Sequence, residues 1–258
     1  MRPLLEIRGM CYIAPMREIR IHTQALLEPG AETVLALSPS RHLIRVLRQG
    51  TGARVTLFNG DNREYLAEIT QADPQAARLR VLEERAANRE SPLAVHLLAG
   101  ISKGERMDFT VQKAVELGVA SIRPVFCSAT VVRLDADKAE KRQQHWQDIA
   151  IAACEQSGRN RVPRVLPARD FASALVQAEP GLRLVLHGGA CQGLRDLEHP
   201  RETAVTLLIG PEGGLSAMEI QTGEAAGFTG IRLGPRILRT ETAGMAALAA
   251  VQTLWGDW

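Results

Sequence analysis

Two glycine-rich turns in the last quarter of the chain carry the residues best suited to ligand chemistry. The first reads GPEGG at residues 210–214, and the second reads GPRILRTETA at residues 234–243. Glycines leave main-chain N–H groups uncovered by side chains, and a helix start close to the first turn adds partial positive charge. We therefore expect a polar ligand to bind along this main chain.

Three predicted strands lead into glycine-containing turns. The apolar run at 205–209 stops at a glycine and a proline, as is typical of a strand buried on both faces of a parallel sheet. Similar strands are predicted at 182–186 and 231–233, each followed by a glycine turn. Because ligands bind beyond the carboxyl ends of strands in open α/β sheets, these three strand ends predict a pocket.

The helix after the first turn has a well-defined start. Ser216 and Glu219 have the S-x-x-E spacing of a capping box, and Leu215 with Ile220 occupies the positions of a hydrophobic staple. An Ala-rich helix is predicted after the second turn, running to about Trp255.

Composition limits the class of protein. With 258 residues and 45% hydrophobic content, the chain can form one large or two ordinary domains. A net charge of +2 is too small to indicate a nucleic-acid partner by itself. The four cysteines form no C-x-x-C pair, which argues against a structural zinc site and fits a reducing cytosol; they are Cys11, Cys127, Cys154 and Cys191.

The ends and the hydropathy of the chain give further expectations. No apolar stretch approaches the roughly 20 residues of a membrane span, so we expect no membrane partner. Residues 1–15 are a poor signal peptide, since they contain no continuous apolar region. Because residues 16–20 resemble a natural beginning, residues 1–15 are expected to be an upstream extension of the reading frame.

The first part of the chain, from Met16 to about residue 84, predicts a small β-barrel. Strands are expected at 33–37, 54–58, 65–70 and 78–82. One helix after Ser40 places three arginines on one face, Arg41, Arg45 and Arg48, with Leu43, Val46 and Leu47 packing opposite. This arginine stripe is either a solvated helix face or a surface that follows nucleic-acid phosphates.

Beyond a predicted linker at 85–92, the pattern alternates between strands and helices. Strands are expected at 93–99 and 122–126, and helices at 106–117, 138–157 and 170–177, with Gly118 and Gly158 ending the first two helices. Trp146 and Cys154 lie on the apolar stripe of the second helix and are expected in the core. This alternation predicts an α/β domain with a mostly parallel sheet.

Common catalytic motifs are missing from the sequence. There is no G-x-x-x-x-G-K-[ST] loop, no G-x-G-x-x-G fingerprint and no G-x-S-x-G elbow. The six histidines have no metal-ligand spacing, so we expect no metal. Spacing alone thus predicts a ligand pocket in an α/β domain beside a basic, β-rich domain, without defining a reaction.

Five longer strings resemble one family. They are KGERMDF at 103–109, QKAVELG at 112–118, ACEQSGR at 153–159, IGPEGGLS at 209–216 and LGPRILRTETA at 233–243. Together they resemble the RsmE family of bacterial 16S rRNA uracil-N3 methyltransferases. The resemblance implies a PUA-like RNA-binding β-barrel at 16–88 and a SPOUT domain at 89–258. It also implies a C-terminal trefoil knot at about 182–258, a homodimer in the cytoplasm, and the small ribosomal subunit as partner.

The same resemblance implies S-adenosylmethionine as cofactor, bound at the three strand ends. Main-chain groups of Leu186, Gly210, Leu233 and Leu238 would pair with its adenine and ribose. The full set of implied cofactor contacts is Leu186, His187, Gly188, Ile209, Gly210, Pro211, Glu212, Gly213, Gly214, Leu233, Gly234, Ile237, Leu238, Thr240, Thr242 and Ala243.

Methylation at uracil N3 needs a cation or a proton acceptor, because N3 is protonated at neutral pH. The candidates are Arg236 as the cation facing the base, with Arg239 nearby, and Glu212 or Glu241 as acceptor. Either carboxylate has an equally good structural role, at a turn or a helix start. The expected RNA contacts are Arg17, Arg20, Arg41, Arg45, Arg48, Lys103 and Arg106.

One segment departs from the family pattern. After the strand at 122–126, relatives usually carry a Ser-Glu-Arg-like stretch, where this chain has Cys127, Ser128, Ala129 and Thr130. This puts details of RNA contact in doubt, not the cofactor pocket. Two other functions stay open: a ribose 2′-O-methyltransferase of the same superfamily, and a non-catalytic RNA-binding assembly factor. A nucleotide-binding oxidoreductase is more distant, since its fingerprint is absent.

Overall fold

The computed structural model describes residues 18–131, 136–201 and 203–258. The chain divides into two compact units, with the division along the sequence at Arg85 and Ala86. The expected extension at residues 1–15, and Arg17, lie outside the described residues. Each unit has its own sheet and its own core.

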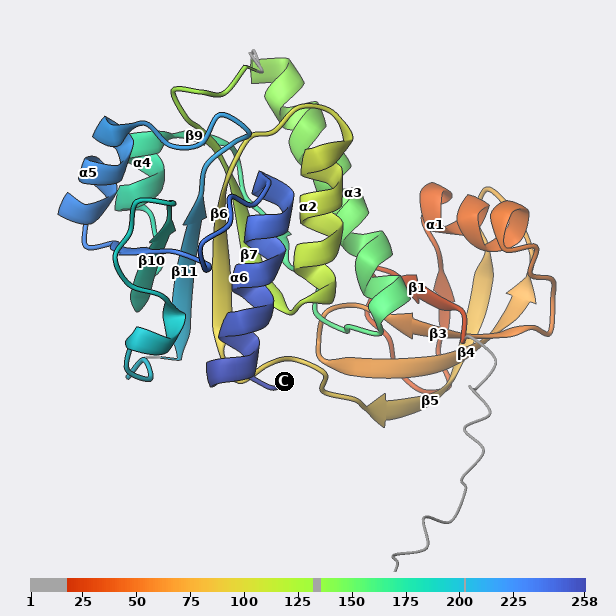
Figure 1. Cartoon of the computed structure of the whole chain (residues 1–258). Helices are drawn as coiled ribbons and strands as arrows, with labels where there is room; N and C mark the ends of the chain where they lie inside the picture. The colour runs from red at the N-terminus through yellow and green to blue at the C-terminus, as the bar shows by residue number, and fades with distance from the viewer. Residues whose placement is uncertain (1–17, 132–135, 202) are drawn as a thin grey trace, which may run out of the picture. The chain divides into compact units, whose positions relative to one another are not determined.

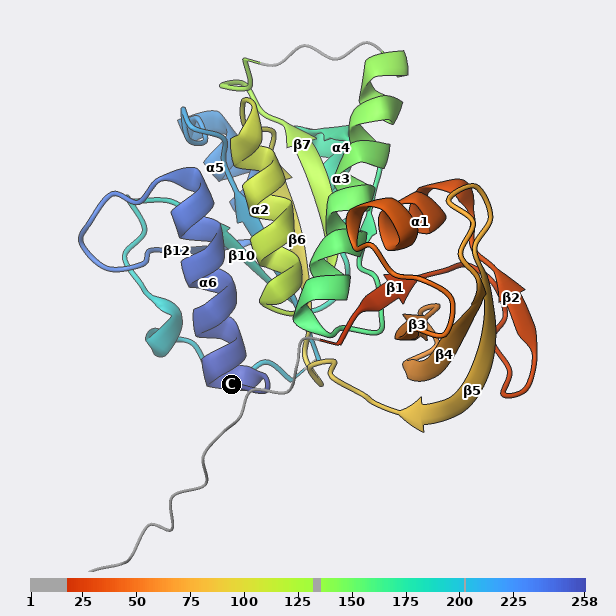
Figure 2. The same ribbon diagram turned by 90° about the vertical axis from the view of Figure 1, so that its right-hand side faces the viewer.

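The first unit is built on a curled sheet of five strands, which forms a half-barrel (Figure 2). The strands are β1 (Arg20–His22), β2 (Glu32–Val34), β3 (Arg54–Phe58), β4 (Arg63–Gln71) and β5 (Arg78–Ala86). Their order is β1-β3-β4-β5-β2, with β1 parallel to β3 and the pairs β3–β4 and β2–β5 antiparallel. The predicted β-rich unit is therefore present as an open, curled sheet.

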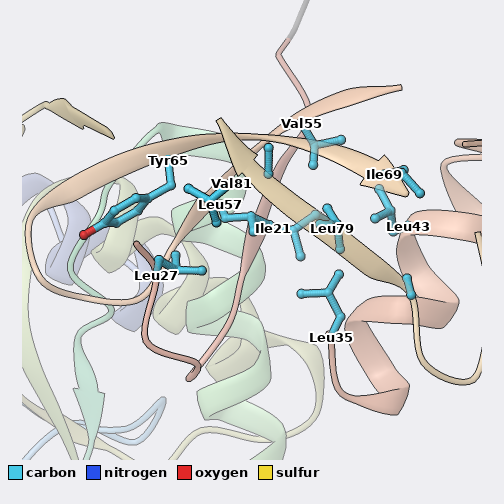
Figure 3. Close-up of a cluster of buried hydrophobic side chains, with 12 residues drawn as sticks. Ile21, Leu27, Leu35, Leu43, Val55, Leu57, Tyr65, Ile69, Leu79 and Val81 are labelled. Atoms are coloured by element: carbon cyan, nitrogen blue, oxygen red, sulfur yellow. The ribbon is translucent and has the colours of Figure 1, made fainter. Parts of the chain in front are cut away.

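Alternating side chains of this sheet build its core. Tyr65, Ala67 and Ile69 of β4 are buried on one face, and Leu79 and Val81 of β5 join them in the same cluster (Figure 3). Successive residues of a strand point to opposite faces, so this period-2 pattern holds one face of the sheet in the core.

The helix of the first unit differs from the prediction. Helix α1 (Leu37–Arg41) begins before Ser40, and a π-helix, η1 (His42–Val46), continues it. Ser40 lies buried inside α1, where its hydroxyl donates to the Leu35 carbonyl and accepts from the Ala77 N–H. The strand predicted at 33–37 ends at Val34, because the chain enters α1 at Leu37, before Ser40.

The π-helix also breaks the expected arginine stripe. An i→i+5 hydrogen bond widens the turn and rotates the residues that follow it. Leu43 is buried as predicted, but Val46 is 65% exposed, and Arg48 has a φ of 54° beyond the end of η1. Arg41, Arg45 and Arg48 are all exposed, yet they do not lie on a single α-helix, because η1 and the left-handed backbone at Arg48 interrupt it.

The second unit is built on a parallel sheet, which confirms the α/β prediction. Its strands are β6 (Ala94–Gly100), β7 (Val119–Phe126), β8 (Arg164–Val165), β9 (Arg169–Asp170), β10 (Leu182–Leu186), β11 (Ala204–Ile209) and β12 (Thr229–Ile231). The order is β12-β10-β11-β6-β7-β8, with β9 also beside β7, and every described pairing is parallel. The third glycine-turn strand ends at Ile231, two residues before its predicted end.

Helices cover both faces of this sheet. They are α2 (Glu105–Glu116), α3 (Ala136–Ser157), α4 (Phe171–Val176), α5 (Ala217–Ala225) and α6 (Thr240–Trp255), with a short 3₁₀ turn, η2 (Leu194–Asp196). Helices α6, α2 and α3 lie side by side (Figures 1 and 2). Ile209 of β11 faces α6 at Gly244, whereas the neighbouring Leu208 packs in the cluster that contains the α4 residue Leu175.

The predicted helix ends and core residues of this unit are confirmed. Gly118 and Gly158 follow α2 and α3 with φ values of 83° and 84°, the left-handed conformation that glycine adopts readily. Trp146 and Cys154 are buried. Asp170 caps α4 by accepting a hydrogen bond from the N–H of Ser173.

The segment predicted as a linker is anchored within the second unit. Strand β5 takes in its first two residues, and the rest is held by buried polar groups. Arg159, which is 5% exposed, pairs with Glu90 and also donates to the carbonyls of Val115 and Val119. Ser91 donates to the fully buried Gln252 of α6 at 2.8 Å. The entry to this unit is therefore fixed rather than loose.

Candidate active site

The three predicted strand ends meet at one edge of the parallel sheet. Leu186 of β10 stands opposite Ile209 of β11 on one side and opposite Ile231 of β12 on the other. Parallel pairing in this register brings the turns after the three strands together. The sequence segments around 187, 210 and 232 are thus neighbours in space.

A cavity of about 920 Å³ lies at this edge. The residues expected to hold a cofactor form much of its wall: Leu186, His187, Gly188, Ile209, Gly210, Pro211, Glu212, Gly213, Gly214, Leu233, Gly234, Ile237, Leu238, Thr240 and Ala243. The candidate catalytic residues Arg236 and Glu241 also line it, together with Arg106. Thr242 and Lys103 do not.

Several wall residues were not predicted as cofactor contacts. They are Gly189, Leu215, Ile220, Ile231, Arg232, Pro235 and Arg239. Leu215 and Ile220 were assigned only to the helix start, although their position beside the glycine turn is the signal that places them in the wall. Ile231 joins because β12 ends earlier than predicted.

Glycine keeps the main chain accessible at the cavity. Among the described residues, no heavy atom would lie within 4 Å of a Cβ added at Gly188, Gly214 or Gly234, so the chain there borders open space. At Gly210 the opposite holds, because a Cβ would lie 2.7 Å from the carbonyl carbon of Gly214. Exposed peptide groups and apolar walls such as Ile209 suit a ligand with polar edges and flat apolar faces, as in an adenosyl group.

Glu212 reaches out of the cavity wall and is already bonded. Its carboxylate accepts from the Lys103 N–H at 2.8 Å and from the Arg106 guanidinium at 3.0 Å. Burial raises the pKa of Glu212, but hydrogen bonds from the Lys103 N–H, its own main chain and Arg106 together lower it below its ordinary value. A carboxylate with a lowered pKa and two donors is a weak base, so these contacts favour the structural role of Glu212 at the turn over that of a proton acceptor.

The second glycine turn contains Arg236, Arg239 and Glu241. Both arginines are exposed, and Glu241 is partly buried in the first turn of α6. Thr240 ties this turn to the first one, since its hydroxyl donates to the Gly210 carbonyl at 3.1 Å. The structure therefore brings the candidate cations and the remaining acceptor candidate to one cavity.

Ile237 is the most exposed apolar residue of the second glycine turn. Ile237 belongs to the cavity wall, but its side chain is 101% exposed. The loop from Gly234 to Ile237 is exposed along its length and forms an open side of the cavity. Leu233 and Leu238 are partly buried and remain as apolar walls.

His187 forms part of the cavity floor. Its N–H donates to the Ile231 carbonyl at 3.1 Å, and its imidazole lies close to Gly230, where a Cβ would stand 2.6 Å from Nε2. Nε2 is buried and lies 3.9 Å from Oε1 of Glu224, without a hydrogen-bond partner in the described part of the chain. The ring is therefore held by packing under β12.

The loop of residues 127–130 packs against the first glycine turn. Ala129 packs against Gly213, where a Cβ would lie 2.7 Å from the Ala129 side chain. Cys127 is buried, and burial together with the nearby Glu219 charge raises the pKa of its thiol to about 12. Cys127 is thus an inert packing residue, and the loop supports the cavity wall.

The predicted RNA contacts of the first unit do not all reach the surface. The Arg20 guanidinium is paired with Glu64, and its side chain is only 8% exposed. This pairing removes Arg20 from the candidate phosphate contacts. Arg41, Arg45 and Arg48 are exposed and stay available.

Within residues 18–131, 136–201 and 203–258, no cluster of three or more His, Cys, Asp or Glu side chains could hold a metal ion. None of the helices in these ranges is long and apolar enough to span a membrane.

The fold and the cavity define an RNA methyltransferase. The family model of the RNA methyltransferase domain matches residues 89–252, and that of the RNA methyltransferase PUA domain matches residues 40–82. More narrowly, the chain belongs to the family of ribosomal RNA small subunit methyltransferase E.

Relatives and solved structures match nearly the whole chain. The ribosomal RNA small subunit methyltransferase E of Buchnera aphidicola from Schizaphis graminum is 35% identical, covering 92% of this chain and 97% of the relative. The Bacillus subtilis protein of the same name is 32% identical over 81% and 85%. The Neisseria gonorrhoeae enzyme of that name, solved bound to S-adenosyl methionine, is 42% identical with a TM-score of 0.87, covering 93% and 99%. A Legionella pneumophila protein solved with bound SAM is 40% identical with a TM-score of 0.91, over 94% and 100%.

Proposed function

We propose that this protein transfers a methyl group from S-adenosylmethionine to N3 of a uridine in the 16S rRNA of the small ribosomal subunit. The observation that carries this proposal is the glycine-lined cavity at the carboxyl ends of three strands that end in register, in a chain of this family. The bound S-adenosyl methionine of the Neisseria gonorrhoeae relative supports the choice of cofactor.

The cofactor is held by main-chain groups and apolar walls. Peptide groups of Leu186, Gly210, Leu233 and Leu238 would pair with its adenine and ribose, and Ile209 would provide an apolar wall. When bound, S-adenosylmethionine supplies a methyl group on a positively charged sulfur. Glu212 and Thr240 keep the two turns in register around it.

The target base is activated by charged groups at the second turn. Uracil N3 carries a proton at neutral pH, so its reaction is favoured by a cation that stabilises the uracil anion. Arg236 provides this cation, and Glu241 accepts the N3 proton. Because N3 lies on the Watson–Crick edge, the uridine must be unpaired or extruded from its stack before it reaches the cavity.

The RNA is gripped by basic side chains of both units. Arg41, Arg45 and Arg48 of the first unit contact phosphates, and Lys103 adds a contact in the second. Arg106 lines the cavity and pairs with Glu212, so it acts on the cofactor side of the site.

The proposed function includes an architecture beyond the parallel sheet. The C-terminal segment from about 182 to 258 forms a trefoil knot, which is supported by the two glycine turns lining one cavity and by the Thr240–Gly210 hydrogen bond between them. The enzyme acts as a homodimer in the cytoplasm, where ribosomes assemble. The thiols of Cys127 and Cys191, which form no disulfide within the described residues, agree with that compartment.

One experiment tests cofactor, substrate and position together. Purified protein is incubated with labelled S-adenosylmethionine and small subunits that lack the modification, and the methylated atom is mapped by nucleoside analysis. We expect N3-methyluridine. A ribose methyl would indicate the 2′-O-methyltransferase alternative, and binding of subunits without any transfer would indicate an assembly factor.

A further inference from the structure

The buried carboxylate of Glu219 connects the first glycine turn to a different part of the sheet. Glu219 is 8% exposed and lies in the first turn of α5. One of its oxygens accepts from the N–H and the hydroxyl of Ser216, at 2.8 and 2.9 Å, which forms the predicted capping box. The capping box accounts for only half of its hydrogen bonds.

The other half comes from the loop after β7. The Ser128 N–H donates to Oε1 of Glu219 at 2.7 Å, and the Ser128 hydroxyl donates to Oε2 at 2.8 Å. Ser128 is 91 residues away in sequence, in the loop after β7. The donors of Ser216 are enough to cap the helix. The two donors of Ser128 are therefore not needed for capping and have a different effect.

That consequence concerns the cavity wall. Ser128 precedes Ala129, which packs against Gly213, and Ser216 directly follows the turn of residues 210–215. The carboxylate is thus bonded to residues on both sides of that turn. The first glycine turn is also held at Glu212 by Lys103 and Arg106 and at Gly210 by Thr240, so the Glu219 bonds to Ser128 are a separate anchor beside Gly213.

We propose that Glu219 and Ser128 are positioning residues that hold the glycine turn in its cofactor-binding conformation. The proposal rests on the proposed function, because this turn is the one that binds S-adenosylmethionine. The hydrogen bonds between Ser128 and Glu219 form a clamp on this turn. Without the clamp, the turn samples other conformations, and S-adenosylmethionine must select the conformation that binds it, which weakens the apparent affinity for the cofactor. The chemistry after binding is unaffected.

The test compares Ser128→Ala with Ser121→Ala. Ser121 lies on β7, the strand before the Ser128 loop, and its hydroxyl contacts Nδ1 of His96 at 2.8 Å, near the start of the strand and away from the turn. Calorimetry of each variant with S-adenosylmethionine should give binding weaker on the order of tenfold for Ser128→Ala, as for the loss of one bond to a charged acceptor. Ser121→Ala should bind S-adenosylmethionine like wild type. Ser128→Thr, which keeps the hydroxyl donor, should also bind it like wild type.

Steady-state kinetics and amide exchange separate positioning from general loss of structure. The KM for S-adenosylmethionine should rise in Ser128→Ala while kcat stays within about twofold. Amide hydrogen exchange without ligand should become faster at residues 210–216 in Ser128→Ala and in Glu219→Gln, and unchanged elsewhere in the sheet.

Each result has a defined meaning. Equal affinity and equal exchange in Ser128→Ala and wild type would overturn the clamp, whatever the cofactor. A wild-type protein that binds no S-adenosylmethionine would contradict the proposed function alone, since the exchange comparison still decides the clamp. Faster exchange in the whole domain would assign Ser128 to stability and reject a positioning role.

Discussion

Arg236 is the single side chain on which the proposed chemistry depends most. It lies in the second glycine turn, exposed at the cavity, where a cation can face the target base. We expect Arg236→Ala to lower the single-turnover rate at saturating RNA and cofactor by about 10²- to 10³-fold, the usual loss for one electrostatic stabiliser. Arg232→Ala, which removes an equal charge from the same cavity wall, is the control. A wild-type rate for Arg236→Ala would remove it from the mechanism.

Two hydrogen-bonded carboxylates, Glu212 in the first glycine turn and Glu219 in α5, predict a pH dependence of stability. Burial raises the pKa of Glu219, but its hydrogen bonds with Ser216 and Ser128 lower it overall, and the pKa of Glu212 is lowered as well. A lowered folded-state pKa gives stability that is complete above the ordinary value of 4.5 and lost as pH falls through the folded value.

We therefore expect the thermal midpoint of the wild type to fall as the pH drops below about 4.5. Glu219→Gln removes part of this dependence, so its midpoint should change less over the same range. The matched control is Glu28→Gln, which removes an exposed carboxylate. Parallel pH curves for wild type and Glu219→Gln would show that Glu219 carries none of the effect.

Residue types at the turns could be predicted, but their partners could not. Glu212 and Glu241 are both acids in a glycine turn, and only the structure separates them, because the partners of Glu212 are Lys103, from the loop after β6, and Arg106, from the start of α2. Arg20 is similar: the sequence gives no sign that Glu64, 44 residues away, will pair with it. Long-range partners of this kind need the register of the sheet.

Among the elements, the end of β6 sets the position of the first turn. A Cβ on Gly100 would lie 2.4 Å from the nitrogen of Pro211, so strand and turn touch through their main chains. We expect Gly100→Ala to lower the stability of the folded protein by about 1–3 kcal/mol, as for an overpacked core, and to weaken cofactor binding. Thermal and chemical denaturation measure the first effect, and calorimetry the second.

Gly50→Ala is the control for that substitution. Among the described residues, no heavy atom lies within 4 Å of a Cβ added at Gly50, and its φ is not in the left-handed region. Its stability should stay within about 0.5 kcal/mol of wild type. If both variants behaved alike, the contact between Gly100 and the turn would not be limiting.

Element types were largely predictable, and the exceptions have local causes. The capping box at Ser216 and the glycines after α2 and α3 are confirmed, since each depends on residues a few positions apart. The helix of the first unit was misplaced because Ser40 looks like a cap but bonds to Leu35 and Ala77. A π-helix has no comparable sequence signal, and it redirected Val46 and Arg48.

At the scale of the whole molecule, the two units are expected to divide RNA grip from cofactor binding. Replacing Arg41, Arg45 and Arg48 by glutamine should weaken binding of small subunits and lower the salt dependence by roughly one unit per lost phosphate contact. Binding of S-adenosylmethionine should not change. Filter binding over a salt series and calorimetry measure the two effects.

A matched triple variant controls for net charge. Arg54, Arg78 and Arg80 are exposed arginines on strands of the same unit, and their replacement removes the same charge. Equal losses in both triple variants would indicate a general charge effect. An unchanged salt slope in the Arg41, Arg45 and Arg48 variant would end the proposed role of these side chains.

The α/β class, the pocket and the family could be reached from the sequence, because strand ends and glycine turns are local patterns and the motifs are long. The third-strand boundary, the exposed Ile237 and the clamp at Ser128 could not, since each depends on how distant segments meet. Sequence patterns thus located the cavity, and tertiary contacts decide which residues line it.

The central claim is that main-chain groups of the two glycine turns bind the methyl donor at the three strand ends. A crystal structure of this protein soaked with S-adenosylmethionine tests it most directly. We predict density for the donor in the cavity, with hydrogen bonds to peptide groups at Leu186, Gly210, Leu233 and Leu238. A donor bound elsewhere, with the turns filled by their own side chains, would contradict the account.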